Sequence, residues 1–547
     1  MNNTIQKTES KNIFFAFPLV WEIILMLVVL SLRFLCHRNM GSSFVNEGDV
    51  LPLARQYFDS SWMPQDWYLN QPAGYRLLFQ TLIGWLTVNF GFLGASIIGR
   101  LVCYSLVATG LVLIGKRLRL SLPYLLLAII LFTYPYEISH QGVIAKEWLV
   151  GGLEAKAIAY GFILIAIAFF LAGRYLITAL LLGCATSFHV LVGGWAFLTC
   201  LGLFLLRPRQ KLPQINQNIP LLLFAYTTTS IFAISPVWQQ LMTQTPINPD
   251  MPSPSFIYVF LRLSHHLNPL SWKAQSWIKV IVYLLILLGN MVLLKNRTKP
   301  NKFQNSRQIL GELALVSLIP FLLGISITAF DSQGQWLQYY PFRFGDIMLP
   351  LTTFLLLACS LQDVFLSRKY QIKSIACIGI IALFIGLQGI AFAENLSKLQ
   401  NFPSKQQGVS WQWKDMSNWI KQNTDKNAVI ISSPAELPNF TWITERSTIV
   451  KLKLFSQNKT QIIEQYKRLD DLSGNHSFSH YLNSGNLNRK KTRKILADGY
   501  DSLTTSQAKD LMTKYHASYF LTRINHNLDL EVAYLQKPYI LYFNPIS

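Results

Sequence analysis

The sequence predicts a polytopic α-helical membrane protein with about eleven transmembrane helices and a C-terminal α/β domain outside the membrane. Of the 547 residues, 51% are hydrophobic and only 14% are charged, which is unlike a soluble protein. Apolar stretches long enough to cross a bilayer recur along roughly the first 390 residues. The rest mixes polar and apolar positions as globular domains do. We therefore expect a membrane domain over 1–393 and a soluble domain over 394–547.

The net charge of +21 by itself is compatible with a nucleic-acid partner. Most cations, however, flank the apolar stretches, where membrane proteins carry their cytoplasmic anchors, so we expect no nucleic acid. The six cysteines lie in or beside apolar segments, and none lies in the C-terminal domain: Cys36, Cys103, Cys184, Cys200, Cys359 and Cys377. This distribution predicts neither a disulfide framework nor a thiolate zinc site.

The first apolar run, Phe14–Cys36, exceeds 20 residues and lacks a small-residue cleavage site, so we interpret it as a retained helix. Residues 37–94 form the first outer loop. Its apolar segment 75–90 resembles a span, but the cations at 116–119 and the N-terminus should both be cytoplasmic. One helix out and one back, at 95–115, satisfies both conditions. Segment 75–90 is therefore predicted to be an amphipathic helix on the outer membrane surface.

Nine further helices are predicted from apolar segments, near 121–135, 156–172, 175–188, 191–206, 218–237, 277–295, 309–329, 346–364 and 372–392. The pair at 175–206 is short, with its tip at 187–194. Cationic loops alternate with cation-poor loops along this series. The alternation predicts a multi-pass inner-membrane protein with a cytoplasmic N-terminus and a periplasmic C-terminal domain.

The C-terminal domain has the pattern of an α/β fold. Helical spacing occurs at 411–423 and 506–515, and strand patterns occur at 428–432, 448–454 and 517–522. The polar, basic stretch 473–494 is expected to be an irregular excursion.

Ionisable side chains gather in the predicted outer loops. Acids there can act as a general base or hold a metal, and cations can bind an anionic phosphate. The candidates are Glu47, Asp49, Arg76, Glu154, Lys156, His189, Tyr339, Tyr340 and Arg343. Simpler interpretations stay open: acids favour outer loops, His189 is structural, Arg343 anchors a helix end, and Glu154 pairs with Lys156. Since the chain has no Walker motif and no dinucleotide fingerprint, a nucleotide-driven pump is not expected.

Short motifs resemble those of the GT-C membrane glycosyltransferases, which include aminoarabinose transferases, protein O-mannosyltransferases and oligosaccharyltransferases. These proteins carry an acid in a large first outer loop, which Asp49 matches best and Glu47 second. Segments 54–55, 60–62 and 71–76 resemble the AR…GDW…P pattern before the surface helix.

Later motifs extend this resemblance to most of the chain. LGCATSFH at 182–189 resembles a helix-pair motif, with His189 where lysine is usual, and Arg343-Phe344 with Pro350 resembles RY…P. KYHASYF at 514–520 resembles a closing strand of the outer domain. The lysine of the surface helix is missing, and Arg76 is the nearest cation.

The resemblance implies an inverting glycosyltransferase that moves a sugar from a polyprenyl-phosphate-linked donor to a glycan, lipid or protein acceptor at the outer face. Asp49, with Glu47 as alternative, would be the base, and Glu154 a second acid; a divalent metal at Asp49 and Glu154 is left open. Arg76, His189 and Arg343 would bind the phosphate, with Lys156, Tyr339 and Tyr340 beside them. To replace a lysine, His189 would have to be protonated.

Two other functions remain open from sequence. A lipid or polyisoprenoid transporter or flippase would show midplane charges and inverted halves, and the sequence shows neither. A non-catalytic membrane scaffold would account for the departures from the motifs.

Overall fold

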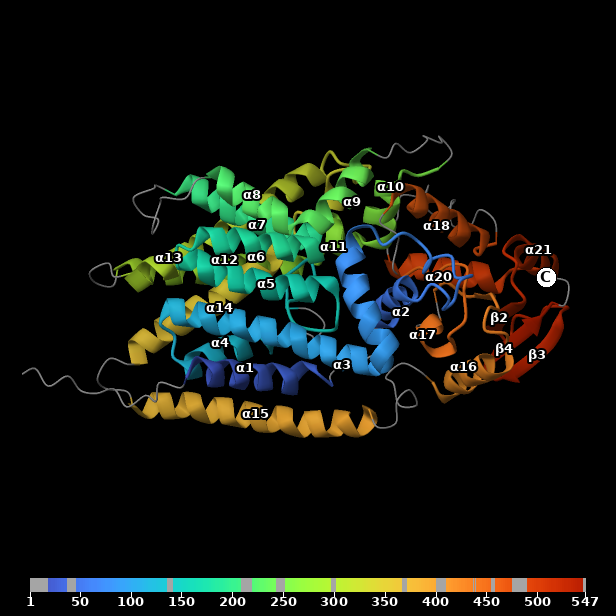
Figure 1. The fold of residues 1–547 in the computed structure, drawn as a ribbon, viewed down its shortest axis with the longest axis horizontal. Helices are drawn as coiled ribbons and strands as arrows, with labels where there is room; N and C mark the ends of the chain where they lie inside the picture. The colour runs from blue at the N-terminus through green and yellow to red at the C-terminus, as the bar shows by residue number, and fades with distance from the viewer. Residues whose placement is uncertain are drawn as a thin grey trace, which may run out of the picture.

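The computed structural model describes residues 18–36, 46–134, 141–207, 219–242, 251–296, 302–365, 371–399, 410–435, 437, 439–453, 458–474 and 489–544. Figure 1 shows a bundle of helices that leads, at one end, into a smaller C-terminal domain containing a sheet.

Apolar helices form the bundle: α1 (Leu19–Phe34), α3 (Leu77–Leu118), α4 (Leu122–Thr133), α5 (Ala155–Leu171), α6 (Tyr175–Phe188), α7 (Val190–Leu206), α8 (Ile219–Thr229), α9 (Ile231–Met242), α12 (Ala274–Asn296), α13 (Lys302–Thr328), α14 (Arg343–Phe365) and α15 (Gln371–Leu399). Helices α3 and α5 pack closely because each presents a glycine to the other. A Cβ at Gly110 would collide with Leu164, and one at Gly161 with Leu106.

Four described helical segments are long and apolar enough to cross a bilayer: 74–118, 274–294, 305–328 and 343–364. The pair α8–α9, bent by 84°, would be a fifth, and shorter apolar helices of 10–17 residues accompany them. The multi-pass helical class is thus supported, whereas the number eleven stays a prediction.

The helix expected at 218–237 is broken at Ser230 into α8 and α9. Hydroxyl groups of Thr228, Thr229 and Ser230 donate to carbonyls three or four residues earlier, which weakens the helical hydrogen bonding here.

Helix α3 changes direction at Gly91, whose φ of 67° and ψ of 176° are not helical. In Figure 1 the part before Gly91 runs across the end of the bundle and the part after it runs along the bundle. Glycine allows this bend because it lacks a Cβ. That segment 75–90 lies on a membrane surface stays a prediction.

The C-terminal domain contains a four-stranded sheet in the order β1-β2-β4-β3. Strands β1 (Ile430–Ser432) and β2 (Tyr519–Arg523) are parallel, and β4 (Tyr539–Phe543) is antiparallel to β2 and to β3 (Glu531–Gln536). Its helices are α16 (Trp411–Asn423), α17 (Phe440–Thr444), α18 (Lys459–Asp471), α20 (Arg489–Asp501) and α21 (Thr505–Lys514). The α/β class and the helices at 411–423 and 506–515 are confirmed.

The strand predicted at 448–454 is wrong for its described part, 448–453, which forms no strand. Its neighbour Ser447 makes an isolated bridge to Val429. The amide of Thr448 instead donates to the Asp66 carboxylate of the first loop, 3.1 Å away. The Thr448 amide therefore forms its hydrogen bond outside the sheet, with a residue far away in the sequence.

The C-terminal domain packs against the loop predicted at 37–94, whose described part contains α2 (Glu47–Phe58). The rings of Phe92 and Trp442 lie 4.8 Å apart. Asp66 is 1% exposed and joins Leu69 of its own loop to Thr448 of the domain. The boundary predicted at 393/394 falls inside α15.

Candidate functional site

The candidate site lies at the end of the bundle that faces the C-terminal domain, where the loop 141–154 meets α14. The loop is held by the carboxylate of Asp346, which accepts from the amides of Ile144 (2.8 Å), Ala145 (3.1 Å) and Glu147 (3.2 Å). Buried loop amides need such partners, so Asp346 fixes the position of Glu147.

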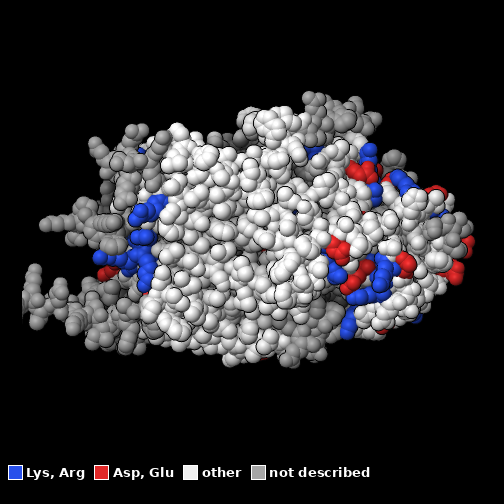
Figure 2. All heavy atoms as spheres, in the orientation of Figure 1, with Lys and Arg blue, Asp and Glu red and all other residues white. Residues whose placement is uncertain are grey.

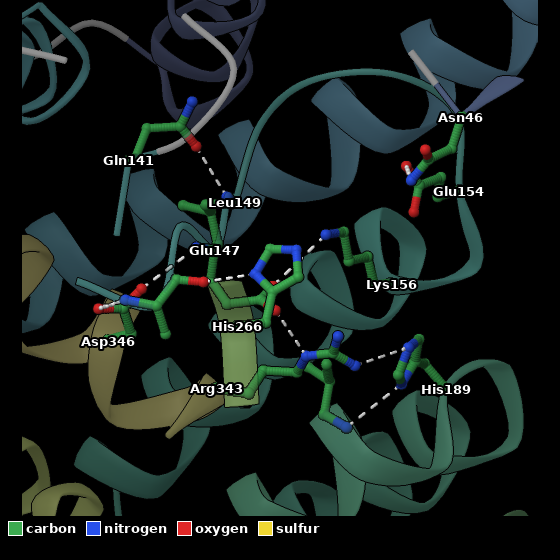
Figure 3. A network of polar contacts seen from close by, with 12 residues as sticks. Asn46, Gln141, Glu147, Leu149, Glu154, Lys156, His189, His266, Arg343 and Asp346 are labelled. Carbon is green, nitrogen blue, oxygen red and sulfur yellow. Dashed lines mark hydrogen bonds and ion pairs between the residues drawn. The ribbon is translucent and has the colours of Figure 1, made fainter. Parts of the chain in front are cut away.

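Glu147 is the centre of a buried charge cluster (Figure 3). Its carboxylate accepts from Arg343 Nε at 2.8 Å and from Lys156 Nζ at 3.4 Å. Burial opposes ionisation, but Arg343 and Lys156 lower the pKa of Glu147 to about 2. Two buried cations therefore share the Glu147 carboxylate, while the carboxyl groups of Asp346 and Glu154 also lie close enough to act on this cluster.

His189 separates α6 from α7 and contacts this cluster. Its Nε2 lies 3.2 Å from Arg343 Nη1, and its Nδ1 accepts from the amide of Val192 at 3.3 Å. Burial, and then the charge of Arg343, lower the pKa of His189 well below its ordinary value. A protonated ring would carry N–H groups at both nitrogens and would lose both contacts. The structure thus favours neutral His189, and the protonated form expected from the resemblance needs an added negative charge nearby.

Aromatic faces hold both cations of the cluster. Arg343 Cζ lies 3.8 Å from the ring centroid of Tyr340, and Lys156 Nζ lies 4.1 Å from that of Trp148. Tyr340 is therefore part of the cluster. The side chain of Tyr339 is 42% exposed, and this residue uses its carbonyl, which accepts from Trp195 Nε1 at 2.8 Å.

Asp49, in the first turn of α2, lies at the interface with the C-terminal domain. Its oxygens are 3.3 Å from Lys453 Nζ and 3.6 Å from Lys451 Nζ. Burial raises the pKa of Asp49, but the two lysines outweigh it, so the pKa is lowered and Asp49 stays ionised at neutral pH. No pattern in the sequence links Asp49 to these two lysines.

Glu47 is fully buried and points into the bundle. It accepts from Arg100 Nε (2.7 Å), from Ser96 Oγ (2.7 Å) and from the amide of Leu153. Arg100 also donates to the carbonyl of Leu35 at 3.0 Å. Both carboxylate oxygens of Glu47 are occupied, so the geometry favours a structural role over catalysis.

Glu154 lies between the two groups of cations. It accepts from Asn46 Nδ2 at 2.9 Å, and the charges of both Lys156 and Lys453 act on it. Burial nevertheless raises the pKa of Glu154. Arg76 lies further along the first loop and donates to the hydroxyl of Tyr68 at 3.2 Å, and its charge also acts on His189.

The donors at Asp49 and Glu154 do not fit a divalent metal. Two ammonium groups lie beside Asp49, and Glu154 has an amide neighbour. No group of three or more His, Cys, Asp or Glu side chains in the described residues could hold a metal ion. We therefore assign no step to a metal.

From sequence, Glu147 and Asp346 belong to the polar groups of the predicted outer loops but have no assigned role, and Lys451 and Lys453 are not among the candidates. Glu147 stands in a mixed acidic and basic segment between apolar helices, which is a usable signal. Lys451 and Lys453 belong to a domain that begins hundreds of residues after Asp49, so only the tertiary structure shows their contact.

Acidification is expected to destabilise this end of the molecule through His266, whose Nδ1 lies 2.6 Å from the carbonyl oxygen of Ala145. Burial first, and the nearby Lys156 and Arg343, lower the pKa of His266 to about 3. Because the unfolded chain binds this proton near pH 6.5, stability is full above pH 6.5 and falls between 6.5 and 3. The loss from pH 7.5 to 5 is about 2 kcal/mol.

Thermal unfolding of wild type and His266→Gln at pH 7.5 and pH 5 checks this expectation. The variant should lose less stability than wild type between these two pH values. The exposed His516 supplies the matched control, because His516→Gln removes a histidine without removing a buried one. An identical pH response of wild type and His266→Gln would contradict it.

Comparisons with known proteins give one sequence match and several similar structures. A sequence family described as "Domain of unknown function (DUF6798)" matches residues 411–472, which contain Lys451 and Lys453. No curated protein matches the chain.

The similar structures include the Archaeoglobus fulgidus oligosaccharyltransferase in its apo form, at 11% identity and a TM-score of 0.46, covering 94% of this chain and 70% of that one. The same organism's oligosaccharyltransferase AglB, in complex with an inhibitory peptide and a dolichol-phosphate, is 12% identical with a TM-score of 0.45. The match covers 92% of this chain and 69% of that one. ArnT from Cupriavidus metallidurans, bound to undecaprenyl phosphate, is 11% identical with a TM-score of 0.47. The match covers 96% of this chain and 97% of that one. The similarity concerns the course of the chain, and the function proposed for this protein rests on its own residues.

Proposed function

We propose that this protein is a membrane glycosyltransferase that transfers a sugar from a polyprenyl-phosphate-linked donor to an acceptor at the face of the membrane bearing the C-terminal domain. The observation that carries the proposal is the pair of buried cations, Arg343 and Lys156, at the end of the apolar helices. Arg343 and Lys156 share the single carboxylate of Glu147, and the charge of Arg76 reaches His189 beside them. A phosphate group would accept charge-assisted hydrogen bonds from these cations.

In the proposed reaction, an acceptor hydroxyl attacks the anomeric carbon while its proton passes to the Asp49 carboxylate. The new bond joins the acceptor oxygen to the anomeric carbon, and the bond from that carbon to the phosphate oxygen breaks with its electron pair. The lipid phosphate leaves with one more negative charge, which Arg343 and Lys156 stabilise. Direct displacement inverts the anomeric centre. Asp49 is ionised before reaction, and Glu154, with its raised pKa, is the second acid available for the proton.

Binding of undecaprenyl phosphate to the purified protein in nanodiscs tests the phosphate site. Arg343→Gln removes a charge-assisted contact, so affinity should fall by about 10- to 100-fold. Arg307→Gln is the matched control, because Arg307 also pairs with a carboxylate, Asp363, at 2.6 Å, but at the opposite end of the bundle. Lys156→Gln gives a second variant if Arg343→Gln unfolds. Equal affinity for undecaprenol and its phosphate would overturn the proposal.

The orientation proposed is a cytoplasmic N-terminus and a periplasmic C-terminal domain in the inner membrane. Figure 2 shows basic residues at the bundle end opposite that domain, and a nearly uncharged belt between the two ends. Lys116, Arg117 and Arg307 lie near the ends of α3 and α13 at this basic end. Reporter fusions after residue 394 should therefore be active outside the cytoplasm. Cytoplasmic activity there would reject the orientation.

A further inference from the structure

A cavity of about 480 Å³ lies next to the candidate site, where the first outer loop, the end of α9 and the start of α18 meet. Its volume falls within the range of roughly 300–1,000 Å³ that is usual for small-ligand sites. Three separate parts of the chain thus enclose one space, and the proposed function has so far used only Arg76 of its lining.

The lining is rich in neutral hydrogen-bonding groups. It contains six side-chain amides, Gln71, Gln80, Gln239, Gln240, Asn458 and Gln461, together with the phenols of Tyr68 and Tyr75. Arg76 is the one charged residue among the described residues that line it. An amide offers both donors and acceptors, which matches the alternating needs of sugar hydroxyls. A purely apolar ligand would leave the buried side-chain oxygen of Gln80 without a hydrogen-bond partner, and a polyanion would meet a single cation.

Gln80 gives an independent sign of a missing ligand. Its side chain is 2% exposed, and its Oε1 has no hydrogen-bond partner among the described residues. Leaving a buried acceptor without a hydrogen-bond partner is energetically unfavourable. A ligand hydroxyl in the cavity could donate to this oxygen and remove that cost.

The location of the cavity suits a sugar carried on a lipid phosphate. On α9, Trp238 is 61% exposed and Leu241 is 56% exposed, so this wall has an apolar outer face. Arg76 lines the cavity, and its charge also acts on His189, which contacts the cluster of Glu147, Arg343 and Lys156. A sugar in the cavity would therefore lie within reach of a phosphate bound by that cluster.

We infer that this cavity is a saccharide-binding site for a neutral sugar, with Gln80 as a specificity-determining residue. The inference rests on the proposed function for the placement of the phosphate, but the affinity for saccharide comes from the amides. The sugar comes from the lipid-linked donor or from a glycan acceptor, and the two sources share the same hydroxyl chemistry.

Gln80→Met tests the inference, because it keeps the length of the side chain and removes the unpaired acceptor. Its melting temperature should equal or exceed that of wild type, since no protein hydrogen bond is lost at Oε1. Affinity for the saccharide should fall about 3- to 10-fold. Gln461→Met removes an amide that α18 contributes to the lining, and Gln335→Met is the control on an exposed glutamine outside the cavity.

Five probes separate the outcomes: undecaprenyl phosphate, undecaprenyl-phosphate-linked glucose, undecaprenyl-phosphate-linked mannose, free cellobiose and free maltose. If Gln80→Met binds only the lipid-linked sugars more weakly than wild type does, the cavity belongs to the donor. If Gln80→Met binds a free disaccharide more weakly, the cavity belongs to the acceptor. If Gln80→Met binds every probe as wild type does while Arg343→Gln weakens the phosphate, the cavity inference is wrong and the proposed function stands. If undecaprenyl phosphate does not bind but disaccharide binding depends on Gln80, the proposed function fails instead.

Discussion

Asp49→Asn is expected to lower turnover by about two to four orders of magnitude, the usual contribution of a general base. The change keeps the size of the side chain and removes the charge that Lys451 and Lys453 approach within 3.6 Å and 3.3 Å. Turnover of an undecaprenyl-phosphate-linked sugar by the purified variant is the measurement. Folding should be largely kept, because the two lysines that lose their partner are themselves partly exposed.

Lys453→Gln is the companion variant for Asp49. It removes one cation and leaves the carboxylate in place, so it should lower turnover less than Asp49→Asn does. Full activity in Asp49→Asn together with loss in Glu154→Gln would assign the proton transfer to Glu154. Full activity in both variants would refute the mechanism.

Glu47→Gln is expected to act on stability, with a loss of about 3–5 kcal/mol, because it leaves Arg100 buried without a counter-charge. Arg100 and Glu47 are 1% and 0% exposed, and their atoms Nε and Oε1 lie 2.7 Å apart. Chemical or thermal unfolding in detergent measures the loss.

The control for Glu47 is Glu445→Gln, whose pair with Lys421 is substantially exposed, at 27% and 47%. Exposed pairs contribute about 0–1 kcal/mol, so this variant should unfold nearly as wild type does. The structural role would be contradicted if Glu47→Gln were as stable as wild type, or if it were fully folded but defective in turnover. Glu47 would then be a catalytic candidate again.

The two acids of α2 show why the sequence alone could not rank them. Glu47 and Asp49 are two positions apart, which places their side chains about 200° apart around a helix. One side therefore faces Arg100 of α3 and the other faces the lysines of the C-terminal domain. Sequence and resemblance favoured Asp49, but they gave no reason for Glu47 to be structural.

The sequence by itself determined the membrane class and most helix positions, because spans are long apolar runs and cations mark one end of them. The helix at 175–188 was predicted to the residue, and the break at His189 lies within the tip predicted at 187–194. The helix at 411–423 was also predicted to the residue. These features depend on local periodicity and capping, which neighbouring residues carry.

The tertiary structure alone decided the pairing of charges. Glu147 joins Arg343 across 196 residues and Asp66 joins Thr448 across 382, distances in sequence over which no local pattern extends. Such a contact also explains the missing strand at 448–453, because the amide of Thr448 donates to Asp66 and not to a neighbouring strand. A buried carboxylate needs a counter-charge or donors wherever the fold provides them, so its role follows from three-dimensional neighbours and not from its place in the chain.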